Sequence, residues 1–506
     1  MGEKKLMRAK QETFIYFMPA KNYFIRLMSE IIAQRLHSNS KHIVIPVYGE
    51  LFDESLESRY PKFLKRVQLR IVYWKRQFSL NKTLKTKLKF YLGNQQIKSV
   101  QFIPAAYFLL TSAIDHCLMQ TKKEKLNSIS DFEISDQVID TYLRFKPSEK
   151  YIYNDSFVND IWHRARSLNR LIKSYTSKRS GQKICISSYS SYIHEGVFTR
   201  QAVLSNCTLV TLGSTHSYYK IHNVSNGRKP SHMEDHNCYT IANAQELPDQ
   251  VIKAAKNTLL NRAHGKYDNS MPYMKNSPKN DHENNLLASK ICSGKVIMLL
   301  HDFFDAPHSY DWMLFTDFWT WATDTIEFCI KHQIPLVIKP HPNQINESAK
   351  VVEKLKNQFK TSGLVQWIPA EIPNSTIFHH KPLFILSVYG SVAAEAACFG
   401  LKVLLAGDHP GINFKIAHTA LTKEDYWDCL RNPEKVINGS VEEAIYFTAI
   451  HNKNIFLNSN DALWTHEGID DKTTETNPQQ LLTESANQYV LEMTKKLLND
   501  LEKNDI

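Results

Sequence analysis

Short apolar runs alternate along the chain with longer segments in which apolar residues recur at helical spacing. The runs that predict β-strands are His42–Tyr48, Lys183–Ser188, Thr208–Leu212, Lys295–His301, Pro335–Lys339, Leu383–Ser387 and Lys402–Ala406. Several are apolar throughout, which is typical of strands covered on both faces of a parallel sheet. The segments that predict helices between the later strands are Tyr310–His332, Ser348–Ser362 and Ser391–Gly400. This alternation predicts an α/β fold with doubly wound sheets.

A polar stretch, Ala263–His282, divides the chain because it contains two prolines and has no apolar periodicity. The predicted organisation is an N-terminal Rossmann-like domain over 1–262, a linker over 263–290 and a C-terminal Rossmann-like domain over 291–445. The remaining 446–506 are expected to be helical, with a last apolar stripe that packs back on the domains.

Composition supports a globular protein and narrows its partners. The chain has 506 residues, of which 42% are hydrophobic and 22% charged, so it is expected to bury a large core. Lys and Arg number 62 against 51 Asp and Glu, a net charge of +11 that suits anionic partners. The 8 cysteines include no CxxC pair, which disfavours a zinc module or a disulfide scaffold and favours a reducing compartment.

The predicted location is cytoplasmic, either free or peripheral on the inner face of the plasma membrane. No apolar signal core follows the N-terminus, and no apolar run reaches the roughly 20 residues of a membrane span. The segment Lys62–Arg76 interleaves cations with aromatic residues and would suit docking on an anionic leaflet, but a solvated helix face is the favoured explanation. No nucleic-acid-binding module is present, so no nucleic acid partner is predicted.

The common catalytic signatures are missing. The sequence contains no GxGxxG, GxxxxGK[ST], HExxH, GxSxG or DxD motif. Dinucleotide-binding, P-loop, zincin, α/β-hydrolase and metal-dependent single-domain glycosyltransferase interpretations therefore lose their usual support.

One candidate element is the strand that ends in Lys339-Pro340-His341-Pro342-Asn343. Parallel α/β sheets bind ligands at the carboxyl ends of their strands, and flanking prolines would stiffen the loop and aim His341 into the crevice. Lys339 would add positive charge. The structural alternative is a surface turn whose histidine caps the next helix.

A second candidate is Ser387-Val388-Tyr389-Gly390-Ser391, which opens into the helical segment containing Glu395. A strand that turns into a helix presents backbone N–H groups and the positive end of the helix dipole to an anion such as phosphate. The hydroxyls of Ser387 and Ser391 can add hydrogen bonds, and Glu395 can reach a ribose hydroxyl. A tight strand-to-helix connection would have the same pattern.

A third candidate follows the strand KVIMLL, where His301, Asp302, Asp305 and His308 lie close together in sequence. Carboxylates at such a strand end could act as nucleophile or base. A metal site is the competing functional interpretation, but nothing in the spacing selects a metal, and no metal is predicted. Helix capping is the structural alternative.

The N-terminal half adds Glu195, which follows the strand KICISS, and Arg200 five residues further on. Glu195 would place a carboxylate at the rim of a cleft between the domains, and Arg200 could neutralise an acidic substrate. Each is also compatible with a purely structural role.

The order of these motifs resembles that of bacterial capsule and lipopolysaccharide glycosyltransferases that use CMP-activated acidic sugars. The HP motif of those enzymes is similar to Lys339-Pro340-His341-Pro342-Asn343, and their S motif to the segment from Ser387 to Glu395. The families are the retaining Kdo transferases, the pseudaminic acid transferases and the polysialyltransferases. The resemblance covers mainly residues 290–410 and implies a GT-B fold, with two Rossmann-like domains facing a cleft.

Carried over by position, the resemblance implies that His341, Ser387 and Ser391 hold the CMP phosphate and that Glu395 binds the ribose. Tyr389 and Gly390 belong to the same motif. A nucleophilic Asp ends a Q-x-x-x-D segment in the retaining Kdo enzymes. The equivalent spacing here is His301-x-x-x-Asp305, so the missing Gln leaves Asp302 and Asp305 both open. Glu195 matches the acid/base towards the acceptor.

The function implied is transfer of a Kdo-, pseudaminic- or sialic-type sugar from a CMP-sugar to a glycan or glycolipid acceptor. The aspartate-rich loop after KVIMLL favours retention of the anomeric configuration. No cofactor beyond the donor substrate is expected, because histidine, lysine and a helix dipole can stabilise the leaving phosphate. The alternatives are a CDP-polyol phosphotransferase of the teichoic-acid type and a non-catalytic scaffold of polysaccharide assembly.

Overall fold

A computed structural model of the chain describes the two Rossmann-like units. The residues it describes are 13–17, 22–35, 40–44, 82, 85–95, 98, 100–102, 134–149, 156–177, 179–187, 190–212, 219–222, 239–267, 271, 274, 282–310, 312–452 and 484–503. Contacts divide the chain into unit 1, formed by Met1–Thr141, Ile152–Met233 and Asp461–Ile506, and unit 2, formed by Tyr142–Tyr151 and Glu234–Asn460. Each unit is described by itself.

Unit 1 is built on a 6-stranded sheet of order β3-β2-β1-β4-β5-β6. All neighbouring strands are parallel except β5 and β6. Its strands are β1 (Thr13–Phe17), β2 (Ser40–Val44), β3 (Val100–Phe102), β4 (Gln182–Ser187), β5 (Thr208–Leu212) and β6 (Tyr219–His222). Its helices are α1 (Asn22–Arg35), α6 (Ser156–Thr176), α7 (Tyr192–Leu204) and α19 (Glu484–Lys503), while α5 (Ser135–Phe145) begins in unit 1 and ends in unit 2.

Unit 2 is built on a second 6-stranded sheet of order β12-β11-β10-β7-β8-β9, parallel throughout. Its strands are β7 (Val296–Leu299), β8 (Leu336–Lys339), β9 (Val365–Trp367), β10 (Phe384–Ser387), β11 (Val403–Leu405) and β12 (His418–Thr419). Its helices are α8 (Ile241–Gln245), α9 (Asp249–Ala263), α10 (His282–Cys292), α11 (Phe318–Lys331), α12 (Asn346–Phe359), α13 (Asn374–His379), α14 (Val392–Cys398), α15 (Lys423–Arg431) and α16 (Val441–His451), with a 3-10 turn at Pro433–Lys435.

Both sheets have the Rossmann strand order. Numbered within its own unit, each sheet reads 3-2-1-4-5-6 from one edge to the other. The predicted fold class, α/β of the GT-B type with two Rossmann-like domains, is confirmed by this pair of sheets. In such sheets ligands bind outside the carboxyl ends of the strands where the chain order reverses. That point lies between β7 and β10 in unit 2.

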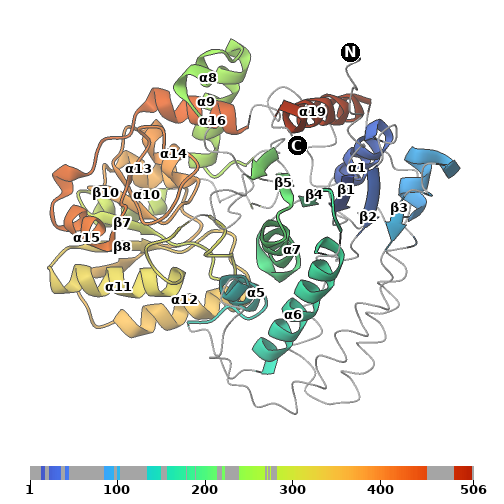
Figure 1. Ribbon diagram of the computed structural model, residues 1–506. Coiled ribbons are helices and arrows are strands. Elements are labelled where there is room, and N and C mark those ends of the chain that lie inside the picture. The colour runs from blue at the N-terminus through green and yellow to red at the C-terminus, as the bar shows by residue number, and fades with distance from the viewer. Residues whose placement is uncertain are drawn as a thin grey trace, which may run out of the picture. The chain divides into compact units, whose positions relative to one another are not determined.

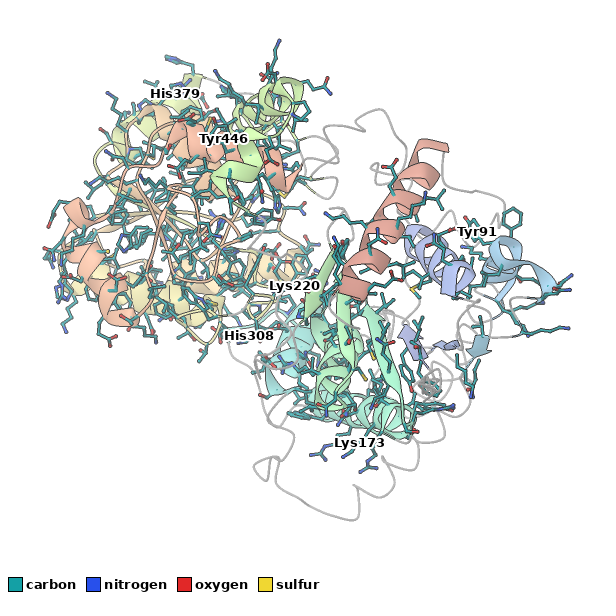
Figure 2. All side chains as sticks on the ribbon, turned by 45° about the horizontal axis from the view of Figure 1, so that its top comes forward. Tyr91, Lys173, Lys220, His308, His379 and Tyr446 are labelled. Atoms are coloured by element: carbon teal, nitrogen blue, oxygen red, sulfur yellow. The ribbon has the colours of Figure 1, made fainter. Side chains whose placement is uncertain are left out.

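The sheet of unit 2 lies between helices, with α11 and α12 on one side and α10, α13 and α14 on the other (Figure 1). Val296 and Met298 of β7 pack in a cluster with Trp321 of α11. Ile297, one position along, packs on the opposite face with Ala396 of α14. Because successive side chains of a strand point to opposite faces, a strand covered on both faces has to be apolar at every position. Figure 2 shows side chains filling the space between these layers.

The core of unit 1 is completed by the last described helix. Val490, Met493 and Leu497 of α19 are buried in one cluster with Ile31 of α1 and Ile184 of β4. These apolar residues of α19 belong to the stripe that the sequence predicts to pack back on the domains. Unit 1 therefore depends on a helix that follows unit 2 in the chain.

The predicted strands all fall on observed ones, but several observed strands were missed. β5 matches its predicted bounds, and in the described part of the chain the ends of the other predicted strands lie within a few residues of the observed ones. The missed strands are β1, β3, β6, β9 and β12. Most of them are short or lie at a sheet edge, where an apolar run is weak. The helix predicted from Tyr310 begins instead at Phe318, because Asp317 accepts a hydrogen bond from the Thr320 N–H and caps it.

The two units divide the chain differently from the predicted domains. The segment from Glu234 to 262 belongs to unit 2, where α9 packs against α16 and α14. The segment from Asp461 onward belongs to unit 1. Part of the predicted linker and all of the basic segment Lys62–Arg76 lie outside the described residues. Within the described part of the chain, no helix is both long enough and apolar enough to span a membrane.

Candidate functional site

The candidate site of unit 2 lies at the carboxyl ends of three adjacent strands. His301 follows β7, His341 follows β8, and Ser387 ends β10. The sheet order places β7 between β10 and β8, so the three predicted motifs come together at the point where the strand order reverses. The sequence predicts these motifs separately, and the topology of the sheet is what joins them.

His301 is held as a neutral ring by the turn after β10. Its Nε2 accepts the backbone N–H of Val388 at 3.2 Å and lies 3.2 Å from the Ser387 hydroxyl. Since a backbone N–H can only donate, this nitrogen carries the lone pair and the Ser387 hydroxyl donates to it as well. The ring stacks on Phe318 with centroids 4.4 Å apart. Burial, helped by nearby His341, lowers the pKa of His301 to about 3, which agrees with the neutral form.

The turn of the S motif is fixed by close packing. A Cβ on Gly390 would lie 2.9 Å from the Ser387 Oγ and 3.7 Å from the His301 ring, so glycine is needed there. The Tyr389 hydroxyl donates to the Ala306 carbonyl at 2.9 Å, which ties this turn to the loop after β7. Ser387 thus orients His301, whereas Ser391, exposed before α14, makes no capping bond with its side chain. Of the two serines predicted to hold phosphate, only Ser391 keeps its hydroxyl at the surface.

His341 presents one nitrogen to its own loop and leaves the other for a ligand. Its Nδ1 accepts the Asn343 N–H at 3.2 Å, so the proton of the neutral ring lies on Nε2. Burial and the charge of Lys339 lower the pKa of His341 to about 4. A neutral histidine with a defined N–H donor is suited to bind an oxyanion such as phosphate.

Lys339 and Glu395 are joined through a residue that the sequence analysis did not single out. The Lys339 Nζ donates to the Asn374 Oδ1 at 3.1 Å, and the Asn374 Nδ2 donates to a Glu395 oxygen at 3.1 Å. Lys339 is 4% exposed and Glu395 3%. Burial lowers the pKa of Lys339 to about 8 and raises that of Glu395, whose ionised form Asn374, Arg262 and Lys339 favour. The described contacts of Glu395 are those of a buried network, and its predicted ribose contact is untested.

The two aspartates after β7 have different surroundings. Asp302 is fully buried, and its Oδ2 has no hydrogen-bond partner among the described residues. The Asp305 side chain is 48% exposed and lies 3.7 Å from the Arg144 guanidinium, which also covers the ring of Phe304. Desolvation by the surrounding protein atoms raises the pKa of Asp302 to about 7 and that of Asp305 to about 6, the latter opposed by Arg144, although the Asp305 side chain is partly exposed. Accessibility therefore favours Asp305 over Asp302 as a group that meets a substrate.

We expect Asp302→Asn to stabilise unit 2 at alkaline pH. A carboxyl whose pKa is higher in the folded than in the unfolded chain destabilises the fold once it ionises, so stability falls as pH rises towards about 7. The amide stays neutral, and the variant should gain about 1–3 kcal/mol at pH 8, with little gain near pH 4. Urea unfolding at both pH values measures this. A gain of equal size at the two pH values would contradict a buried, titrating Asp302.

In unit 1, the two predicted residues of α7 differ in their availability. Glu195 lies in the first turn of α7 and is partly exposed. The neighbouring Gly196 packs closely on α5, since a Cβ there would lie 2.2 Å from the Gln137 side chain. Arg200 is 7% exposed, and both its terminal nitrogens bond the two Asp136 oxygens at 2.7 and 2.5 Å. This pair already neutralises the charge of Arg200, and the expected contact of Arg200 with an acidic substrate stays a prediction.

We expect Asp136→Ala to destabilise unit 1 by about 3–5 kcal/mol, because it leaves the Arg200 guanidinium buried without its partner. Replacing both partners, as in Asp136→Leu with Arg200→Met, should restore much of that loss. Chemical unfolding of Asp136→Leu, Arg200→Met and the double variant measures the coupling. If the loss of unfolding free energy in the double variant equals the sum of the losses in the single variants, the interaction between Asp136 and Arg200 does not stabilise unit 1.

Sequence reasoning missed Arg144, Asn374 and Arg262. Arg144 lies in the last turn of α5, Asn374 opens α13, and Arg262 ends α9, all far in sequence from the loops they approach. No local motif marks them. Only Asn374 carried a usable signal, because Pro373 directly before it is typical of the start of a helix.

No protein-family model matches the sequence, and no curated protein does. Solved structures that match include the UDP-GlcNAc 2-epimerase of Methanocaldococcus jannaschii in complex with UDP-GlcNAc and UDP, with 10% identity, a TM-score of 0.27 and coverage of 87% of this chain and 99% of that one. Anabaena HepE in complex with UDP and glucose has 8% identity, a TM-score of 0.25 and coverage of 97% and 100%. Acinetobacter baumannii MurG has 8% identity, a TM-score of 0.23 and coverage of 96% and 99%. Likenesses this low do not indicate a shared activity.

Proposed function

We propose that the chain is a glycosyltransferase that takes an acidic sugar of the Kdo, pseudaminic or sialic type from a CMP-sugar and transfers it to a glycan or glycolipid acceptor. One observation carries the proposal. The loops that resemble the HP and S motifs meet at the strand-order reversal of unit 2, where His301 bonds the Ser387–Val388 turn and His341 follows the adjacent strand. That is where a Rossmann-like unit binds a nucleotide.

The donor phosphate would be bound by neutral and positive groups of unit 2. The Nε2–H of His341 would donate to a phosphate oxygen, and the exposed Ser391 hydroxyl would add a second donor. Lys339 is too buried for direct contact, but its charge would still favour an anion nearby. Stabilising the phosphate as it leaves lowers the barrier to breaking the bond between sugar and CMP.

The proposed reaction has two displacements and retains the anomeric configuration. The Asp305 carboxylate attacks the anomeric carbon as its bond to the CMP oxygen breaks. The acceptor hydroxyl then attacks the same carbon, loses its proton to a general base and displaces Asp305. Asp305 suits the first role because its side chain is accessible, whereas Asp302 is not.

A donor panel tests the proposal. The full-length protein is incubated with CMP-Kdo, CMP-sialic acid, CMP-pseudaminic acid, CDP-glycerol and UDP-GlcNAc, and nucleotide release is measured. Release of CMP from one CMP-sugar supports the proposal, and NMR of the product then gives its anomeric configuration. Turnover of CDP-glycerol or UDP-GlcNAc alone would show that the donor is not a CMP-sugar, and the proposed donor would change accordingly. No turnover and no nucleotide binding by calorimetry would favour the non-catalytic scaffold.

We expect kcat/KM for the donor to fall as pH drops through about 6. Asp305 must be ionised to attack, and its pKa is raised to about 6 by burial. The pKa values of His301 and His341 are lowered to about 3 and about 4, so these histidines should not contribute to the fall in kcat/KM near pH 6. The same fall should remain in Asp302→Asn. A rate that is flat from pH 5 to pH 8 would argue against Asp305 as nucleophile.

A further inference from the structure

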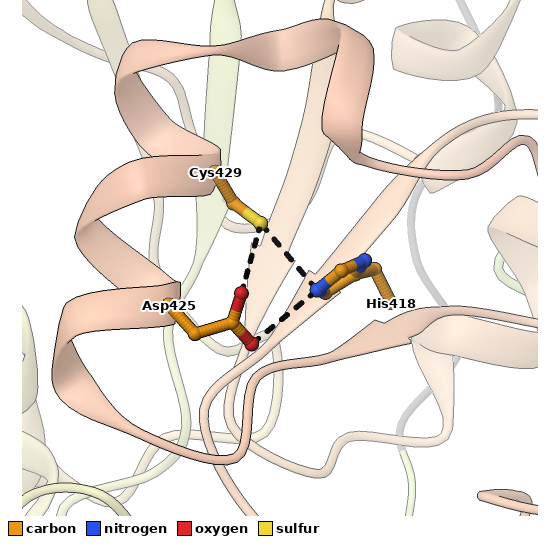
Figure 3. A group of neighbouring side chains, drawn as sticks. All are labelled: His418, Asp425 and Cys429. Atoms are coloured by element: carbon orange, nitrogen blue, oxygen red, sulfur yellow. Dashed lines mark hydrogen bonds and ion pairs between the residues drawn. The ribbon is translucent and has the colours of Figure 1, made fainter.

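A second cluster of reactive side chains lies in unit 2, at the edge strand β12. His418 of β12 faces Asp425 and Cys429 of α15, and Figure 3 shows the three side chains pointing toward one another. Asp425 and Cys429 are four residues apart, so they lie on the same face of the helix. The proposed transfer reaction uses none of these residues.

We propose that His418, Asp425 and Cys429 form a binding site for a divalent transition-metal ion of the zinc type. The three ligand types, an imidazole nitrogen, a carboxylate oxygen and a thiolate sulfur, are those that zinc takes in proteins. Three protein ligands leave one position for water.

The distances between the possible ligand atoms of the three side chains support the site. The Cys429 Sγ lies 3.4 Å from the His418 Nε2 and 3.8 Å from the Asp425 Oδ1, and the His418 Nε2 lies 3.5 Å from the Asp425 Oδ2. A tetrahedral zinc with bonds of about 2.0 Å to N and O and about 2.3 Å to S would separate its ligands by roughly 3.3–3.6 Å. The observed separations are close to these values, with one Asp425 oxygen facing Cys429 and the other facing His418.

The arrangement does not fit a nucleophilic triad. In a Cys–His–Asp triad the acid and the thiol bond different nitrogens of the imidazole. Here Cys429 and Asp425 both approach the same nitrogen, Nε2. Three groups that converge on one point are better satisfied by a cation placed among them.

Charge and access also fit a divalent ion. Binding breaks the Cys429 S–H bond and forms a metal–sulfur bond, the proton passing to solvent with no change of oxidation state. A thiolate and a carboxylate then balance the two positive charges, with the imidazole neutral. Cys429 is buried, but the His418 and Asp425 side chains are 24% and 39% exposed, which gives the ion a route from solvent.

The test uses cobalt(II) as a spectroscopic substitute for zinc in the purified full chain, kept reduced with a phosphine. We expect one equivalent of Co²⁺ to produce thiolate-to-cobalt charge-transfer absorption and the visible bands of a tetrahedral ion, and Zn²⁺ to displace it. Cys429→Ser should abolish the charge-transfer absorption. The matched control, Cys398→Ser, removes a half-buried cysteine elsewhere in unit 2 and should keep it.

Two further variants keep the test decisive if Cys429→Ser does not fold. His418→Gln and Asp425→Asn change partly exposed groups, and circular dichroism checks their fold. Changes outside the ligand shell of metal sites typically cost about 10–100-fold in affinity, so loss of a ligand should weaken Co²⁺ binding by at least about 100-fold. Absence of the charge-transfer band in the wild type would overturn the site. So would a band that survives in Cys429→Ser or unchanged Co²⁺ affinity in the other two variants.

Discussion

Asp305→Ala is expected to lower sugar transfer by about 10³-fold or more, because it removes the proposed nucleophile. The variant should fold normally. Its lost ion pair with Arg144 is long and lies between side chains that are 41% and 48% exposed, and such pairs contribute little to stability. CMP release and product formation, measured with the active donor, give the size of the loss.

Controls for Asp305→Ala separate nucleophilic attack from a general effect of charge. Asp324→Ala removes a partly exposed carboxylate on α11 and should leave transfer unchanged. Azide added to Asp305→Ala could attack from the space left by the carboxylate and yield a glycosyl azide. Transfer by Asp305→Ala within tenfold of the wild type would mean that Asp305 is not the nucleophile, and an inverting mechanism would then be favoured.

His341→Ala is expected to lower kcat by about 10²–10³-fold, the usual effect of removing one donor to a developing oxyanion. The effect should fall more on kcat than on KM, because the bond from the His341 Nε2–H strengthens as the phosphate leaves. His341→Gln retains an N–H donor and should recover part of the loss. Steady-state kinetics with the donor measure both variants.

The matched control is His332→Ala, which removes an exposed histidine at the end of α11 in the same unit. It should behave as the wild type. An unchanged kcat in His341→Ala, together with unchanged CMP affinity by calorimetry, would remove His341 from the phosphate site and with it the main support for the proposed function.

The sequence was sufficient to predict the parts of the site that are carried by local patterns. β7 is apolar throughout, and β8 and β10 are apolar up to their last residues, Lys339 and Ser387, so the strand ends could be placed and with them His301, His341 and Ser387. Their roles in one network could not be predicted. Whether the Ser387 hydroxyl meets phosphate or a histidine depends on which strands are neighbours, and that is a property of the sheet.

Contacts between residues that are far apart in sequence could not be predicted from local patterns. Arg200 and Asp136 are 64 positions apart, and each alone looks like an ordinary surface charge. The chain from Lys339 through Asn374 to Glu395 likewise joins three separate elements. Burial decides whether such charged groups bind a substrate or pair with one another. The burial of charged side chains is poorly predicted from a sequence pattern.

The position of α19 has a consequence for the order of folding during synthesis. Unit 1 lacks part of its apolar core until α19 has left the ribosome, and α19 comes after all of unit 2 in the chain. Unit 2 is almost continuous in sequence and can complete its sheet first, which reverses the usual order in which N-terminal domains fold before later ones. Nascent chains stopped before residue 484 should therefore hold a protease-resistant unit 2 beside a protease-sensitive unit 1, and unit 1 would be the part that chaperones must protect.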